Sequence, residues 1–361
     1  MRSVTLLMTA IAVTAVAVTG VADAAEPAEV VRDVAASEEL FDLFRGRTHQ
    51  DYFPYENGSP PESPVLVTTV DTTADGRQLA VEYSRTQSID SSRLTRTQRY
   101  RTDGTRSTHF LEKTPEPRNL LIECDLPATP PAVFRPHLAV LPDQIGNVTL
   151  SGWLQGQVDN GNQPEPVNSP VKDVRVTGSA TVNGFECTVI EAIKHGPDGR
   201  PSAHYELALA RDRHLIPVRN RTFWYGFSRD NPIDETVVEA FREVEPGVFV
   251  PARWRATKVE SRTADEPEPT VVFTRLTELE DFTLDPEITA ETFAMLEPPE
   301  GAIVQTYRGS DLVSERFNDT EGGRAVTPVE GRPERRTPFL PYAAIGLAVL
   351  AAAGFAYARR R

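Results

Sequence analysis

The side chains that most often carry catalysis are present in this sequence, but their spacing matches no common catalytic or metal site. Its six histidines include no pair at the His-x-x-x-His spacing that binds zinc on one helix face. His195, His204 and His214 fall on successive predicted strands or turns, where we interpret them as solvent-facing. The sequence has no Gly-x-Ser-x-Gly motif and no glycine-rich phosphate loop. We therefore expect no enzyme activity, no catalytic residue, no metal and no cofactor.

Acidic residues dominate the charge of the chain. Aspartate and glutamate number 52, lysine and arginine number 38, and the net charge is −14. With so many carboxylates, a neighbouring pair such as Asp234 and Glu235 arises by chance, so it does not by itself indicate general acid–base catalysis. A surface of this sign repels nucleic acid and anionic lipid headgroups, so we expect neither as the main partner.

Two cysteines, Cys124 and Cys187, are the only candidates for a disulfide bond. In an oxidising compartment they would be able to pair, and closing a loop of this length would stabilise the fold by about 4 kcal/mol in the chain-entropy model. Two buried free thiols are the alternative. Neither cysteine has the flanking residues that are typical of a catalytic thiol.

Aromatic side chains are concentrated in the second half of the chain. A sheet with an aromatic concave side can enclose an apolar cavity, and such a cavity binds an acyl chain without catalytic residues. The alternative is that the same side chains fill an ordinary core. The residues that we expect to line such a cavity are Phe185, Tyr205, Phe223, Tyr225, Phe241, Phe249 and Trp254.

Short β-branched and aromatic runs separated by tight-turn signals position these side chains. Asp-Gly or Asn-Gly pairs end at Gly76, Gly104, Gly184 and Gly199, and this dipeptide favours a two-residue hairpin. Consecutive strands joined in this way are antiparallel, so we expect a mainly β domain, a meander of about ten strands from residue 65 onward. Apolar residues near helical spacing predict an amphipathic N-terminal helix over residues 26–44, followed by a loop over residues 47–64.

Two polar stretches interrupt or follow this domain. Residues 155–170 have almost no apolar side chain, which predicts a disordered insertion. Residues 305–338 are rich in Glu, Arg, Gly and Pro, which predicts a disordered tether. The β domain itself would then occupy residues 25–304.

Both ends of the chain are apolar. Residues 1–24 combine a positive start, an apolar run and a small-x-small site, which is typical of a secretory signal peptide. Residues 339–357 carry no charge and, as a helix, would span about 28 Å, enough to cross a bilayer core. Residues 358–361 would form a cytoplasmic arginine tail. We expect a single-pass cell-membrane protein whose bulk is extracytoplasmic, in the periplasm or at the cell surface. An uncleaved N-terminal anchor, or removal of the C-terminal segment by a sorting enzyme, is the alternative.

Several short elements follow one another in the second half, namely residues 183–187 (NGFEC), 214–219 (HLIPVR) and 247–251 (GVFVP), and then Phe293, Pro299, Gly301 and Val304. This succession, over residues 171–307, resembles the LolA-like group of envelope proteins, which includes outer-membrane lipoprotein carriers and related sensor domains. The resemblance implies a single, strongly curved antiparallel sheet wrapped on the N-terminal helix. It also implies an apolar cavity that binds a lipid or an acyl chain, and no catalysis.

A lipoprotein carrier diffuses between two membranes, which a chain anchored by residues 339–357 would be unable to do. We therefore expect a membrane-tethered extracytoplasmic domain that binds a lipid or an acylated protein locally. The alternative is an envelope regulatory or sensor protein that binds another protein and has no lipid ligand.

Overall fold

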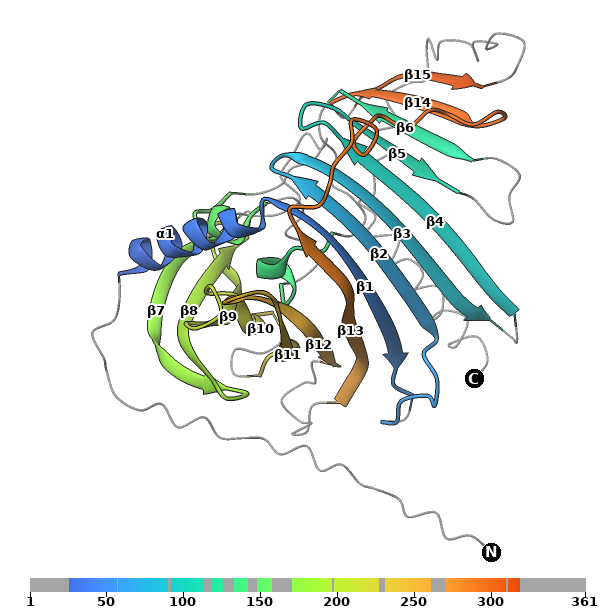
Figure 1. Cartoon of the computed structure of the whole chain (residues 1–361). Helices are drawn as coiled ribbons and strands as arrows, with labels where there is room; N and C mark the ends of the chain where they lie inside the picture. Colours follow the sequence, from blue (N-terminus) through green and yellow to red (C-terminus); the bar gives the residue numbers. More distant parts are fainter. Residues whose placement is uncertain are drawn as a thin grey trace, which may run out of the picture.

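The computed structural model describes residues 26–56, 58–89, 92–112, 119–125, 133–141, 148–157, 171–196, 198–226, 231–260, 270–309 and 311–318. In these residues, fifteen strands form one open sheet. Figure 1 shows the sheet extended along β1 to β6 and strongly curled along β7 to β13. The strands are β1 (Leu43–Pro54), β2 (Leu66–Asp75), β3 (Gln78–Ile89), β4 (Ser92–Thr102), β5 (Ser107–Leu111), β6 (Leu120–Cys124), β7 (Val171–Val182), β8 (Phe185–His195), β9 (Pro201–Ala210), β10 (Pro217–Trp224), β11 (Asp234–Glu245), β12 (Val248–Glu260), β13 (Thr270–Leu284), β14 (Ile303–Arg308) and β15 (Asp311–Phe317).

The mainly β prediction is confirmed, but the sheet is mixed and has more strands than the expected ten. Its order is β15-β14-β6-β5-β4-β3-β2-β1-β13-β12-β11-β10-β9-β8-β7. Two antiparallel runs of neighbours, β1 to β6 and β7 to β13, are joined edge to edge where β1 pairs with β13. The expected all-antiparallel meander is wrong at one position, because β14 pairs with β6 in parallel. This pairing joins segments distant in sequence, which no local turn signal announces.

The N-terminal helix is shorter than predicted. The α-helix α1 covers Pro27–Glu38, starts with a proline in its first turn and buries Val30, Val31 and Val34. A short 3-10 helix, η1 (Glu39–Phe41), follows, and β1 then begins at Leu43. The helix predicted beyond residue 41 and the loop predicted over residues 47–54 are therefore wrong, because ladder pairing with β2 on one side and β13 on the other outweighs local preference. The loop prediction holds for residues 55–56 and 58–64, which belong to no helix or strand.

The region predicted to be a tether is also ordered at its start. Strands β14 (Ile303–Arg308) and β15 (Asp311–Phe317) pair antiparallel, and Val304 packs fully buried against Phe110 and Leu121. The domain therefore extends beyond residue 304. Residues 1–24, 158–170, 319–338, 339–357 and 358–361, on which the signal, insertion, tether, anchor and tail predictions fall, lie outside the described residues. Within the described part, no helix has the length and apolarity needed to span a bilayer.

One face of the sheet, which we call the inner face, carries α1, the 3-10 helix η2 (Pro136–Leu138) and the short helix α2 (Leu150–Leu154). Here α1 and α2 pack on β8 and β9 and form one core cluster with them. The main buried side chains of this cluster are Val30, Val31, Val34, Leu150, Trp153, Leu154, Ile190, Tyr205 and Leu207.

A second, larger cluster lies where residues 133–141 meet the central strands. The ring of Phe134 stacks on Trp254 with 5.8 Å between centroids, and it lies edge-on to Phe44 and Phe282 at 6.3 and 6.0 Å. Gly46 of β1 makes room for it, because a Cβ there would lie 3.0 Å from the Phe134 ring. The inner face is thus filled at its centre by one aromatic side chain from a short coil segment.

Candidate functional site

The seven aromatic residues predicted to line a cavity are distributed over separate places in the structure. Trp254 and Tyr205 lie in the two inner core clusters, where they contact Phe134 and Trp153 respectively. Phe134 is not among the predicted cavity residues, although an aromatic residue next to a Pro-rich stretch is a recognisable signal in the sequence. Tyr205 packs edge-on to Trp153 at 5.1 Å, and burial raises the pKa of its hydroxyl to about 12.

Three further predicted residues form a packed edge, and two of them, Phe185 and Phe241, pack against the larger cluster. Phe185 and Phe241 contact each other edge-on at 5.1 Å between centroids. The guanidinium of Arg213 lies 3.9 Å from the centroid of Phe249 and 5.5 Å from that of Phe185. Cation–π contacts of this kind stabilise a packed surface, so these three rings contribute to stability where β8, β11 and β12 pack together.

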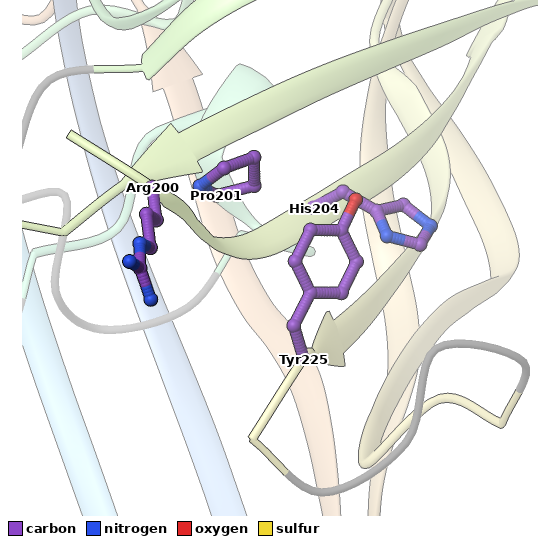
Figure 2. A pocket seen from close by; sticks show the side chains of 4 residues that line it. All are labelled: Arg200, Pro201, His204 and Tyr225. Atoms are coloured by element: carbon purple, nitrogen blue, oxygen red, sulfur yellow. The ribbon is translucent and has the colours of Figure 1, made fainter.

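Of the last two predicted residues, Tyr225 lines an outer recess at the start of β9 and the end of β10, and Phe223 stacks on His204 beside it. A cavity of about 490 Å³ is lined there by Arg200, Pro201, His204 and Tyr225. Figure 2 shows the rings of His204 and Tyr225 side by side, with Arg200 and Pro201 on the other side of Tyr225. The His204 ring stacks flat on Phe223 at 4.1 Å and lies 5.5 Å from Tyr225.

His204 is the imidazole that lines this outer recess. Burial lowers the pKa of His204, while Glu191 and Glu206 act in the opposite direction. Its Nδ1 is buried without a hydrogen-bond partner. Two of the histidines predicted to face solvent are partly enclosed. His204 is half-buried in its stack with Phe223, and His195 Nε2 lies 3.6 Å from a carboxylate oxygen of Asp173.

A serine and a histidine meet where α1 contacts η2. Ser37 Oγ lies 3.1 Å from His137 Nε2, and both atoms also approach the backbone oxygen of His214, at 2.7 and 2.9 Å. Since a carbonyl oxygen only accepts, Nε2 must carry the proton it donates there, and it has no lone pair left to take a proton from Ser37. The pair therefore ties η2 and the turn at His214 to α1 and is not an activated nucleophile.

Burial controls the charge of His137. The side chain is fully enclosed, and desolvation lowers its pKa to about 4. The turn it binds is unusual, since His214 and Leu215 both have left-handed φ angles of 54° and 52°. The hydrogen bonds from Ser37 and His137 stabilise this turn.

Glu38 makes the corresponding contact between α1 and α2. Its carboxylate accepts hydrogen bonds from the backbone N–H of Leu150 at 2.6 Å and of Ser151 at 3.1 Å, and from Ser151 Oγ. Burial raises the pKa of Glu38, and these hydrogen bonds and the charge of Arg135 act in the opposite direction. The segments that cover the inner face are therefore held to α1 by a few polar contacts.

The two cysteines are free thiols in the structure, which is the alternative to a disulfide bond. Cys124 is buried in β6 and Cys187 in β8, and these strands lie on opposite sides of the β1–β13 junction in the strand order. Burial raises the pKa of the Cys187 thiol to about 11. Across the described ranges, no cluster of three or more His, Cys, Asp or Glu side chains could hold a metal ion.

Comparisons with known proteins assign no family to this chain. No family model matches it, and no curated protein matches it. Among solved structures, the chain is similar to a DUF1329 family protein from Desulfovibrio piger, at 8% identity and a TM-score of 0.44, over 74% of this chain and 97% of the other. The LolA-like resemblance therefore stays a prediction.

Proposed function

We propose that this chain is a membrane-tethered extracytoplasmic binding domain that holds a lipid or an acyl chain against the inner face of its sheet, without catalysing a reaction. The observation that most supports this is the thin cover of that face. A sheet is ordinarily covered by a layer of helices or by a second sheet. Here the described cover of fifteen strands consists of α1, with 12 residues, two 3-10 turns, the five-residue α2 and short coil.

The central part of this cover is held mainly by apolar contact. Phe134 is buried among Phe44, Trp254 and Phe282, and its backbone N–H donates to Thr72 Oγ1 at 3.2 Å. Burying such a side chain stabilises by roughly 1.5–3 kcal/mol, and each buried methylene contributes about 0.8 kcal/mol. About four methylenes of an acyl chain would therefore offset the displacement of the Phe134 ring. An acyl chain is thus an energetically adequate occupant of this position.

Photo-crosslinking in membranes tests the proposal. The full chain would be produced in cells fed a fatty acid that carries a diazirine, irradiated, digested and analysed by mass spectrometry. We expect adducts on peptides of β12, β13 and β1 that face Phe134, and more adducts in Phe134→Ala, which empties the position. Phe185→Ala, at the packed edge, is the control and is expected to leave adduct formation unchanged. Absence of adducts on the inner face in both the natural chain and Phe134→Ala would contradict lipid binding there.

One observation favours the alternative function, binding of another protein. β15 lies at one end of the strand order and exposes Leu312 (45%) and Val313 (51%). An exposed edge strand is a template for an added strand from a partner. Replacing both residues by Lys should then abolish co-purification of an envelope partner in a membrane pull-down, while inner-face lipid adducts persist. Retention of the partner in this variant would exclude the β15 edge as the contact.

A further inference from the structure

Six side chains form one continuous row across the inner face. Each residue of the row is directly paired with the next across neighbouring strands, in the order β12, β13, β1, β2, β3 and β4. Directly paired residues in antiparallel strands point to the same face, so the row shares the face on which Phe134 stacks on Trp254. In order, the row is Trp254, Thr277, Gln50, Thr68, Arg85 and Arg96.

The row changes character from one end to the other. It begins at the aromatic cluster, continues through buried Thr277 and Thr68, with Gln50 Nε2 donating to Thr277 Oγ1 at 3.2 Å, and ends at two arginines. Arg85 is half-buried and Arg96 is exposed. An apolar end, a hydroxyl-and-amide middle and a cationic end match the parts of an amphiphile.

Charge is segregated between the two faces of these strands. In β13, β1, β2, β3 and β4 the arginines at inner-face positions are Arg85, Arg96 and Arg275, and every acidic residue belongs to the other face. Glu280, at a register irregularity, shows the same orientation, because its carboxylate lies 3.8 Å from His49 on that other face. The acidic residues are Asp51, Asp71, Asp75, Glu82, Glu278, Glu280 and Asp281. In a chain of net charge −14, an inner face with arginines and no carboxylate on five adjacent strands calls for an anionic ligand.

Arg85 and Arg96 are also placed unfavourably for an unliganded sheet. They are direct cross-strand neighbours, and like charges in this position repel. Tyr52 lies between this pair and Arg275, since the charges of both Arg275 and Arg85 act on its hydroxyl, whose pKa is raised by burial. An anion bound between the two guanidinium groups would remove the repulsion and gain charge-assisted hydrogen bonds.

The length of the row fits an acyl chain. From Trp254 to Arg85 it crosses four strand spacings of about 4.8 Å, or about 19 Å. The acyl chains of one leaflet span about 15 Å, half of a hydrocarbon core of about 30 Å. A lipid whose chain lies along the row, with its end at Phe134 and Trp254, would therefore place its head about 4 Å before Arg85, which is less than one strand spacing.

We infer that the ligand of the inner face is an anionic lipid, whose phosphate or carboxylate headgroup is bound by Arg85 and Arg96 at the end of this row. The inference rests on the proposed function and adds to it the chemical class of the ligand and the residues that select it. Arg85 and Arg96 are its headgroup-binding residues.

Comparing how strongly two photoreactive lipids label the inner face tests this inference separately from the proposed function. The full chain, reconstituted in phosphatidylcholine vesicles, would be irradiated with diazirine-labelled phosphatidic acid or phosphatidylcholine of identical acyl chains. We expect inner-face adducts to favour phosphatidic acid by about five- to tenfold, and the double variant Arg85→Gln/Arg96→Gln to label equally with both. The matched control Arg45→Gln/Arg93→Gln removes the same charge from the opposite face of β1 and β4 and should keep the preference. Thermal unfolding of each variant checks that the sheet is intact.

The outcomes separate the two claims. No inner-face adduct with either lipid overturns the proposed function together with this inference. Equal labelling by both lipids in the natural chain keeps lipid binding and overturns the anionic headgroup. A preference that survives in Arg85→Gln/Arg96→Gln, or that is lost in Arg45→Gln/Arg93→Gln, overturns the assignment to the two arginines. Two competitors distinguish an anionic lipid from a free anion. If a fatty acid reduces the phosphatidic acid adducts and inorganic phosphate does not, the site recognises an anionic lipid.

Discussion

The buried histidine His137 predicts a specific loss of stability in mild acid. Burial lowers the folded pKa of this imidazole from an ordinary 6.5 to about 4, so between these pH values the unfolded chain takes up a proton that the folded chain does not. Because the folded pKa is depressed, the stability that His137 contributes is fully present above pH 6.5. It is lost as the pH falls from 6.5 toward 4. The perturbation is a change from pH 7 to pH 5, in the natural chain and in His137→Gln.

The size of the effect follows from the shift. One pKa unit corresponds to 1.36 kcal/mol, so at pH 5, about 1.5 units below the unfolded pKa, His137 costs about 2 kcal/mol relative to pH 7. His109, in β5, is also buried, its pKa is likewise lowered to about 4, and it adds about the same amount. Against a typical unfolding free energy of 5–15 kcal/mol, a combined loss of about 4 kcal/mol is large. Glutamine at position 137 keeps an N–H donor for the His214 carbonyl but does not titrate.

Denaturant unfolding of the full chain in detergent micelles measures this effect. Fluorescence emission from Trp153 and Trp254, each buried in one of the two core clusters, reports unfolding at pH 7 and pH 5. We expect the drop in unfolding free energy between the two pH values to be about 2 kcal/mol smaller in His137→Gln than in the natural chain. Carboxylates titrate in both proteins and cancel in this comparison. Identical pH dependence in the two proteins would refute the assignment, and a parallel His109→Gln variant should reproduce the reduction independently.

Three further predictions concern the cover of the inner face and the thiols. Glu38→Gln should lower the unfolding free energy by about 1–3 kcal/mol in the same titration, because the N–H of Leu150 loses an ionised acceptor; an unchanged value would contradict the capping role. Trp153→Ala should cost about 3–5 kcal/mol, since it empties a packed position, and a cost below 1 kcal/mol would show that the site is not a filled core. Cys124 and Cys187 should react with Ellman's reagent slowly in the native chain and with a yield of two thiols after unfolding, whereas a disulfide would yield none.

Local turn chemistry made part of this fold predictable. At the β7–β8 turn, Asn183 and Gly184 both have positive φ, 51° and 85°, the conformation that a two-residue hairpin requires and that Asn-Gly adopts at low cost. The same signal located the β2–β3 and β4–β5 hairpins near Gly76 and Gly104. In each case a short stretch of sequence contains the whole cause of the structure.

The elements that were missed depend on partners far away in the chain. β1 forms because it lies between β2 and β13, and the second of these begins more than two hundred residues later. β14 forms because it pairs in parallel with β6, so a polar segment that is typical of a linker is ordered by a distant strand. The aromatic residues were identified as apolar surface, but their division among two inner clusters, a packed edge and an outer recess depends on which face each strand presents, and that is set by register.

Register also determines the charge of the inner face. A slip of one residue in a strand exchanges its two faces, so a slip in β3 would replace Arg85 by a neighbour and bring Glu82 to the inner face. The single irregularity between Arg47 and Thr48 in the β1–β13 pairing keeps Phe44, Gly46 and Thr48 on one side, because the extra residue is accommodated on β13. The aromatic seat for Phe134 and the arginine pair are thus fixed by the same set of pairings, and no composition or motif would reveal either. An insertion of one residue in β2 should therefore disturb both headgroup selectivity and core packing, whereas neutralising Arg85 and Arg96 should disturb selectivity alone.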